Sequence, residues 1–372
     1  MRNLIKNTNP WLPPKTEIDL ILDRIWQSRQ LSNDGEIQQA LEVGLCSYLG
    51  VDNLSLFSNC ATALIAAVRG LGLSGSVVTT PFTFPATTHS LAWNSIEPIF
   101  VDVEPDTGNI DSQKIECALK EHTTAILATH CYGTPCDVDG IANIAEKYNL
   151  RVIYDAAHAF GVRNVSKSIL DFGDASVLSF HATKVFHTIE GGAIVFKNSE
   201  LKSEFNKLKN HGLEKDVDNR SLGLNGKMSE IHAAFGLAQI PHIDCLIADR
   251  RETYRKYETR LAQVPGISFL ETSVKFSHNA AYFPMLVGEE YPHSRDSLVA
   301  LLRNDNIVAR PYFWPLVTSI DEYQKYSNAG CDALPIAKKL ADCIVCLPIY
   351  AEMDSDDLNW IISRVSEYGK KR

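Results

Sequence analysis

The stretch that decides the fold lies between residues 124 and 154. It reads TAILAT (Thr124–Thr129), then VDGIANIAEKY (Val138–Tyr148), then RVIY (Arg151–Tyr154). The first and last segments are short and largely apolar, which is typical of strands covered on both faces, whereas the middle segment spaces its apolar residues as a helix does. Strand, helix and strand in this order predict a parallel sheet flanked by helices.

The same alternation continues on both sides of this stretch. Further candidate strands are Leu54–Phe57, Ser76–Thr80, Pro98–Val103, Ala175–Phe180 and Gly192–Phe196, and further candidate helices are Ala61–Arg69 and Asp111–Lys120. We therefore predict an α/β fold with a mostly parallel sheet and helices on both faces.

The pattern changes after about residue 200, where charged helical segments precede a smaller set of strands and helices. The segment Ala248–Leu261 is predicted to be a long helix that leaves the large domain. We place a large domain at residues 14–247 and a smaller α+β domain at residues 1–13 plus 248–372.

Composition limits the partners of the chain. There are 36 Lys and Arg against 45 Asp and Glu, a net charge of −9, which is too acidic for a broad nucleic-acid surface. No apolar run of signal-peptide length opens the sequence, and glycines and prolines interrupt the nearly uncharged stretch 53–96, so no membrane helix is predicted.

The cysteines indicate a reducing compartment. Nine of them are scattered without a disulfide framework, which fits the cytoplasm. Cys343 and Cys346 form a CxxC motif, but no second pair completes a zinc site, so we interpret them as buried thiols and predict no metal.

Ligands of parallel α/β sheets bind beyond the carboxyl ends of the strands, and four predicted strand ends carry chemistry. Cys60 and Ala61 open a helix, where free backbone N–H groups bind phosphate. Phe84, in PFTFP, could cover a flat ring or cap the core. Asp155 needs a cationic partner if it is buried, and a helix N-cap is the alternative. Lys184 lies between apolar segments, where a lysine loses its proton and becomes nucleophilic.

Together the four strand ends describe a pocket for pyridoxal phosphate. The lysine would bond covalently to this cofactor, and the aspartate would keep its pyridine nitrogen protonated so that the ring acts as an electron sink. The aromatic side chain would cover the face of the ring.

Five segments resemble the DegT/DnrJ/EryC1/StrS sugar aminotransferases, in the same order and over almost the whole chain. They are PWLPP (Pro10–Pro14), PFTFPAT (Pro81–Thr87), DAAHAFG (Asp155–Gly161), SFHATK followed by EGG (Ser179–Gly192), and NGKMSEIHAA (Asn225–Ala234). The resemblance implies the aspartate-aminotransferase fold, fold type I of the pyridoxal phosphate enzymes, and a homodimer that shares its active sites.

The resemblance also implies roles for single residues. Lys184 matches the lysine bonded to the cofactor, Asp155 the partner of its ring nitrogen, and Phe84 the stacking residue. The phosphate would be held by Ser179, by the backbone amides of Cys60 and Ala61, and by Asn225 of the other subunit. His158 stands where glutamine is common and could hydrogen-bond the phenolic oxygen. Ala61 stands where threonine is common, so a hydroxyl contact to the phosphate is lost.

The resemblance is nearest to the branch that forms dTDP-4-amino-4,6-dideoxyglucose (dTDP-viosamine). It implies a cytoplasmic enzyme that moves an amino group from L-glutamate to C4 of a dTDP-linked 4-keto-6-deoxysugar for a surface polysaccharide. Tyr312, His187 and His211 are candidate substrate contacts, each with a structural role as the alternative.

Other functions stay open at this point: a 3-aminotransferase, an aminotransferase for UDP-linked 4-keto sugars, or a ligand-binding regulatory α/β protein. A sugar dehydratase of this fold is disfavoured because its branch replaces the lysine by histidine, and a Rossmann dehydrogenase because no GxGxxG follows the first strand.

Overall fold

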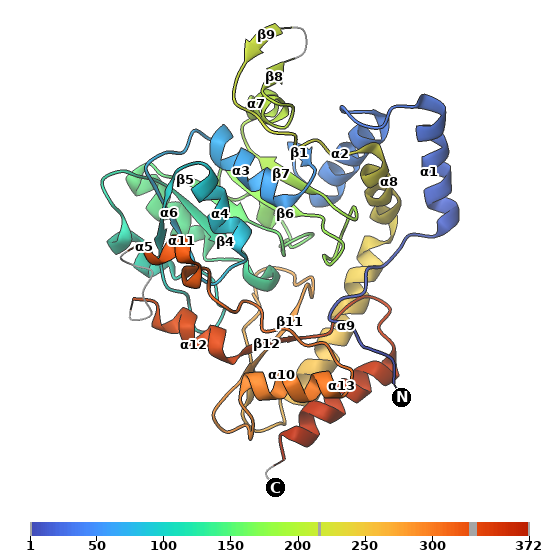
Figure 1. Cartoon of the computed structure of the whole chain (residues 1–372), viewed down its shortest axis with the longest axis vertical. Coiled ribbons are helices and arrows are strands. Elements are labelled where there is room, and N and C mark those ends of the chain that lie inside the picture. Colours follow the sequence, from blue (N-terminus) through green and yellow to red (C-terminus); the bar gives the residue numbers. More distant parts are fainter. Residues whose placement is uncertain (1, 215–216, 327–332, 371–372) are drawn as a thin grey trace.

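The computed structural model describes residues 2–214, 217–326 and 333–370 (Figure 1). Its largest element is a seven-stranded sheet in the order β1-β7-β6-β5-β4-β2-β3. The strands are β1 (Leu54–Phe57), β2 (Ser76–Thr79), β3 (Glu97–Phe100), β4 (Thr123–Thr129), β5 (Arg151–Asp155), β6 (Ala175–Ser179) and β7 (Gly192–Phe196). Only β7 runs antiparallel to its neighbours, so the predicted mostly parallel sheet is confirmed.

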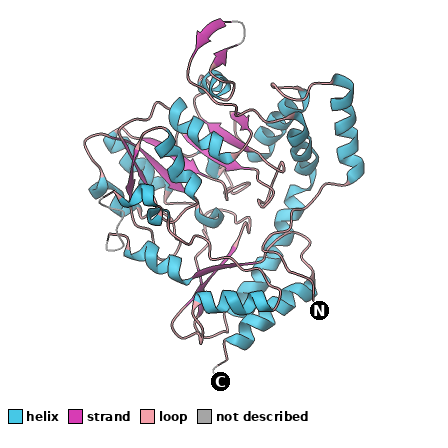
Figure 2. Ribbon diagram, in the orientation of Figure 1, coloured by secondary structure: helices cyan, strands magenta, loops and turns pink. Residues whose placement is uncertain are grey.

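Helices cover both faces of this sheet because alternate strand residues point to opposite sides. On one face Ala125 and Leu127 of β4 pack in a core with α3 (Cys60–Gly70) and α7 (Leu201–Leu208). On the other face Ile126 packs with α2 (Glu36–Leu49), α5 (Ser112–Ala118), α6 (Val138–Tyr148) and α8 (Glu230–Gln239). The sandwich of helix, sheet and helix is visible in Figure 2.

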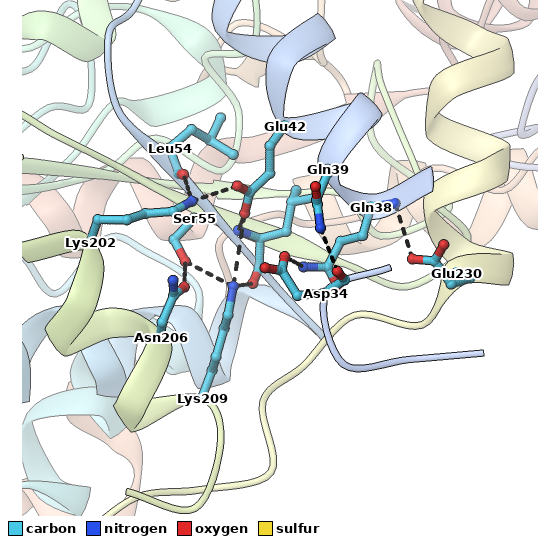
Figure 3. Close-up of polar contacts among 11 residues, drawn as sticks. Asp34, Gln38, Gln39, Glu42, Leu54, Ser55, Lys202, Asn206, Lys209 and Glu230 are labelled. Carbon is cyan, nitrogen blue, oxygen red and sulfur yellow. Dashed lines mark hydrogen bonds and ion pairs between the residues drawn. The ribbon is translucent and has the colours of Figure 1, made fainter. Parts of the chain in front are cut away.

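Two helices precede the first predicted strand, α1 (Lys15–Ser28) and α2. The N-cap of α2 is Gly35, which has no side chain to cap the helix. The buried Glu230 carboxylate does so instead, accepting hydrogen bonds from the N–H groups of Ile37 at 2.9 Å and Gln38 at 3.0 Å. Figure 3 shows the bond from Gln38. A Cβ at Gly35 would lie 2.5 Å from the Glu230 carboxyl carbon, so glycine makes room for this cap.

A second, antiparallel sheet is built from β10 (Ile267–Phe269), β11 (Phe283–Val287) and β12 (Ile344–Leu347). It packs with α9 (Ile243–Leu261), α10 (Arg295–Asn304) and α13 (Ser355–Tyr368). The predicted long helix is present, but it begins at Ile243, five residues before the predicted start. Ile5 forms a bridge with Ile307 and joins this core, so the N-terminal segment lies with the small sheet. The predicted domain boundaries remain a prediction.

The remaining elements are shorter. They are α4 (Pro85–Trp93), α11 (Asp321–Gln324), α12 (Pro335–Cys343), and the strands β8 (Leu213–Glu214) and β9 (Val217–Arg220), which pair at one end of the molecule in Figure 1. Of the predicted thiol pair, Cys346 is buried and Cys343 half-buried, and both are free. Cys331 lies outside the described residues.

One stretch of the described chain, Glu230–Leu261, is long and apolar enough to cross a membrane by length and composition. It consists of α8, a 3-10 turn (Ile240–His242) and α9. Its apolar side chains belong to the two main cores, as those of a packed core helix do.

Candidate active site

A cavity of about 380 Å³ lies at the carboxyl ends of β1, β4, β5 and β6. It is the edge at which the sequence places a ligand. The structure brings to its wall eight of the predicted site residues: Cys60, Ala61, Phe84, Asp155, His158, Ser179, Lys184 and Tyr312. Arg310 and Phe313 also line it, on the segment that leads towards the small sheet.

Asp155 ends β5 and is 4% exposed. Its carboxylate accepts hydrogen bonds from Thr87 Oγ1 at 2.6 Å and from the Ala157 N–H at 3.1 Å. Burial raises the pKa of this carboxyl, and the two hydrogen bonds oppose the rise. No helix begins directly after Asp155, so the N-cap alternative is wrong. Within the described ranges it has no ion-pair partner, which leaves it free to pair with a cationic group of a ligand.

A chain of buried hydroxyl groups supports Asp155. Thr87 Oγ1 lies 2.7 Å from Thr83 Oγ1, which lies 2.9 Å from Thr129 Oγ1 at the end of β4. This Thr87–Thr83–Thr129 chain fixes the direction of the hydroxyl that donates to Asp155. The sequence analysis missed it, because Thr83 lies just before α4 and Thr87 in its first turn, and Thr129 comes from strand β4.

Lys184 lies in the loop between β6 and β7, half-buried at the cavity wall. Its backbone N–H donates to the His181 carbonyl at 2.9 Å, which holds the loop in a turn. Burial lowers the pKa of the amine, which makes its neutral, nucleophilic form easier to reach. Its Nζ donates a hydrogen bond to Tyr282 Oη at 3.2 Å. Tyr282 was not among the predicted site residues.

The turn that opens α3 presents backbone donors to the cavity. The Asn59 side chain caps the helix by accepting from the Thr62 N–H at 2.8 Å. The N–H groups of Cys60 and Ala61 have no acceptor in the described part of the chain. A Cβ at Gly192 would lie 2.7 Å from the Asn59 carbonyl carbon, so glycine lets β7 pass this turn closely. Together with Ser179 at the end of β6, these donors suit an anion such as phosphate.

A buried polar cluster holds the strand that leads into this turn (Figure 3). Lys209 Nζ donates to Ser55 Oγ at 3.1 Å and to the Leu56 carbonyl at 3.2 Å, and it lies 3.8 Å from Glu42 Oε1. Lys202 binds the other oxygen of Glu42. These groups join β1 to α2 and to the end of α7. Because β1 leads into the anion-binding turn, the cluster fixes the position of that turn.

The aromatic wall of the cavity contains His158 and Phe84. His158 Nδ1 accepts a hydrogen bond from the Tyr132 N–H at 3.1 Å, so a neutral ring carries its proton on Nε2. Burial lowers the pKa of this imidazole and keeps it neutral. The Phe84 ring is half-exposed, with its centroid 6.3 Å from that of Tyr312, and it can cover a flat ligand.

Three predicted site residues lie outside this cavity. His187 is buried, and its ring binds the Trp11 carbonyl at 2.8 Å, which anchors the N-terminal segment. His211 is exposed in the turn after α7. Asn225 is exposed beyond β9, in a segment held by a hydrogen bond from the Ser58 N–H to the Gly226 carbonyl at 2.7 Å.

The sequence profile of the DegT/DnrJ/EryC1/StrS aminotransferase family matches residues 15–366. The chain belongs to this family. It is 48% identical over 362 residues to a dTDP-4-amino-4,6-dideoxy-D-glucose transaminase of Shigella dysenteriae, covering 97% of this chain and 98% of the relative. A protein of Escherichia coli with the same name is 42% identical over 350 residues, 94% of each chain.

Solved structures agree with this assignment. The structure of DesI in the presence of its TDP-sugar product superposes with a TM-score of 0.93 at 29% identity, covering 99% of this chain and 93% of that one. Helicobacter pylori PseC, an aminotransferase of pseudaminic acid biosynthesis, gives a TM-score of 0.91 at 27% identity, covering 98% and 99%. The chain is therefore an aminotransferase of fold type I, as predicted.

Proposed function

We propose that this aminotransferase uses pyridoxal phosphate to move an amino group from L-glutamate to C4 of dTDP-4-dehydro-6-deoxyglucose. The products would be dTDP-4-amino-4,6-dideoxyglucose and 2-oxoglutarate. The 48% identity to a relative of that name, over nearly the whole of both chains, carries the choice of sugar and carbon. The cavity supports the cofactor, because Lys184 and a buried carboxylate with no ion-pair partner among the described residues line the same wall.

The residues present fit the cofactor in each of its parts. Asp155 would bind the protonated ring nitrogen, Phe84 would cover the ring, and His158 Nε2 would donate to the phenolic oxygen. The N–H groups of Cys60 and Ala61, with Ser179, would hold the phosphate. When bound, the cofactor supplies an electron sink that stabilises negative charge next to the reacting carbon.

Lys184 carries the proton transfers. Its neutral amine would take the proton from Cα of glutamate as a general base. Nζ would then pass this proton to the bound cofactor, and in the second half-reaction it would take a proton back from the cofactor and deliver it to C4 of the sugar. The lowered pKa suits both tasks, because it increases the neutral fraction of the amine and makes its protonated form a stronger acid.

A homodimer would complete the site. Asn225 is exposed, makes no side-chain hydrogen bond in the described ranges, and sits in the segment that contacts Ser58 through Gly226. We propose that it reaches the cofactor phosphate of a second copy of the chain. The free cysteines support a cytoplasmic location, and a surface polysaccharide is the proposed destination of the sugar.

The test is the first half-reaction. The protein, loaded with pyridoxal phosphate and mixed with L-glutamate alone, should release one equivalent of 2-oxoglutarate and lose its visible absorbance band. Lys184→Ala should reduce the release rate by at least about 1,000-fold, since it removes both nucleophile and base. Release by the wild type and the variant at similar rates would contradict the proposal.

A further inference from the structure

We propose that Tyr282 is a catalytic residue, whose phenol oxygen remains the hydrogen-bond partner of the Lys184 amine while that amine takes up and returns the substrate proton. The inference rests on the proposed function. Its geometric basis is the 3.2 Å distance from Lys184 Nζ to Tyr282 Oη, with Nζ 5.5 Å from the centroid of the tyrosine ring. No other side chain in the residues that the structure describes hydrogen-bonds to this Nζ.

Hydrogen bonds to the segment before β11 fix the position of Tyr282 and so the direction of its hydroxyl. Arg250, buried in α9, donates to the two carbonyls that precede Tyr282, with Nε 3.0 Å from the Ala280 oxygen and Nη2 2.8 Å from the Ala281 oxygen. Asn279 Nδ2 donates to the His158 carbonyl at 2.8 Å, which ties the segment to the loop after Asp155. The segment that carries Tyr282 is thus held by α9 and by the loop after Asp155.

The ring itself is also held. It is 7% exposed and stacks on Tyr312 with a centroid distance of 5.7 Å, and it packs against His158 at 4.6 Å and Tyr132 at 5.8 Å. A phenylalanine would make these ring contacts equally well, so packing alone does not account for the hydroxyl. The hydroxyl points at the one amine that the proposed reaction uses.

A phenol suits an amine that changes its protonation state. Its oxygen donates to a neutral amine and accepts from an ammonium group, so the contact survives both states. When Lys184 Nζ takes the Cα proton, one ammonium N–H donates to Tyr282 Oη, and the tyrosine keeps its own proton throughout. Nζ would pass the Cα proton to the bound cofactor in the first half-reaction. In the second it would take a proton back from the cofactor and deliver it to C4 of the sugar, so the proton count balances without the tyrosine giving up its own proton. Burial raises the pKa of Tyr282, which keeps the phenol protonated.

The variant Tyr282→Phe removes only this hydroxyl. Tyr257→Phe is the matched control, since Tyr257 is a fully buried tyrosine of the small-sheet core whose Oη donates to the Pro348 carbonyl at 2.9 Å. Both variants lose one buried hydrogen bond, and only Tyr282→Phe changes the surroundings of Lys184. Thermal unfolding of both apoproteins measures the structural part of each change.

The first readout needs no turnover. Apoprotein is mixed with pyridoxal phosphate, the growth of the visible band is followed, and borohydride trapping with mass spectrometry assigns the bond to Lys184. We expect Tyr282→Phe to form this bond about tenfold more slowly than Tyr257→Phe, because the amine is no longer held in place.

The second readout is steady-state kinetics with unlabelled and Cα-deuterated glutamate. We expect kcat to fall about 10- to 100-fold, KM for the sugar nucleotide to stay within about twofold, and the deuterium effect on kcat to rise.

Equal bond-formation rates in the two variants, together with an unchanged deuterium effect, would overturn the role of Tyr282. The wild type separates this from a failure of the proposed function. If the wild type forms the lysine bond but releases no 2-oxoglutarate from glutamate, the proposed function is wrong and the Tyr282 role in proton transfer falls with it.

Discussion

Replacement of Thr87 by valine tests how the protein keeps Asp155 ready for a cationic ring. Thr87 Oγ1 donates to Asp155 Oδ2 at 2.6 Å, and both side chains are buried. Valine has nearly the same shape, so Thr87→Val removes the hydrogen bond without opening a cavity. Thr83 keeps its hydrogen bond with Thr129 at 2.9 Å.

The expected magnitude follows from the kind of bond that is lost. A hydrogen bond to a charged acceptor is worth about 1.5–3 kcal/mol, and a pKa unit corresponds to about 1.4 kcal/mol. Burial already raises the pKa of Asp155, and loss of the Thr87 hydroxyl should raise it by about one to two further units. Since the ionised carboxylate is what stabilises the protonated pyridine nitrogen, the Kd for pyridoxal phosphate should rise about 10- to 100-fold.

The assay is a titration of apoprotein with pyridoxal phosphate, followed by absorbance. Thr88→Val is the matched control, because Thr88 is the next residue of α4, is equally buried, and has a hydroxyl with no hydrogen-bond partner in the described part of the chain. This control should bind the cofactor as the wild type does and should unfold at the same or a higher temperature. If Thr87→Val and Thr88→Val bind with equal Kd, the reasoning about Asp155 is refuted.

Three further predictions concern buried polar groups. Burial lowers the pKa of His130 to about 3, so the unfolded chain, with a pKa of about 6.5, binds more protons between these values. The free energy of unfolding of the apoprotein should therefore fall as the pH drops below about 6.5, by up to about 1.4 kcal/mol per pH unit, and urea unfolding of His130→Gln should show a smaller slope. Glu230→Gln should cost about 1–2 kcal/mol, seen as a lower Tm, because it weakens the cap of α2. Glu42→Gln should cost about 2–4 kcal/mol in urea unfolding by leaving Lys209 without its buried counter-charge, and an unchanged midpoint would contradict this.

Local patterns predicted the central sheet well, for physical reasons that lie within each segment. The bounds of β1, β7 and α6 agree with the prediction because apolar runs there are bounded by glycine, serine, asparagine or charged residues. The start of α9 was misplaced because Ile243–Ile247 continues the helix directly after the turn at Pro241. Helix α2 depends on a cap from Glu230, 193 residues away, and no local signal reports it.

The site shows the same difference between residues with a local sequence signal and residues placed by contacts between distant segments. Asp155 and Lys184 could be predicted because a charged residue at or shortly after the end of an apolar strand is conspicuous in sequence. Tyr282 could not, because it reaches Lys184 from a segment 98 residues away that only the packing of the small sheet brings close. His187 is the opposite case, because it is close to Lys184 in sequence but does not line the cavity. Its ring instead hydrogen-bonds to the Trp11 carbonyl.

The measurement that tests the central claim most directly is NMR of the sugar product. The protein is incubated with pyridoxal phosphate, L-glutamate and dTDP-4-dehydro-6-deoxyglucose, and the product is compared with a reaction that contains Lys184→Ala. We predict an amino group at C4, formed in equal amount to 2-oxoglutarate and absent with the variant. An amino group at C3, or no amino sugar from this substrate, would contradict the proposed function.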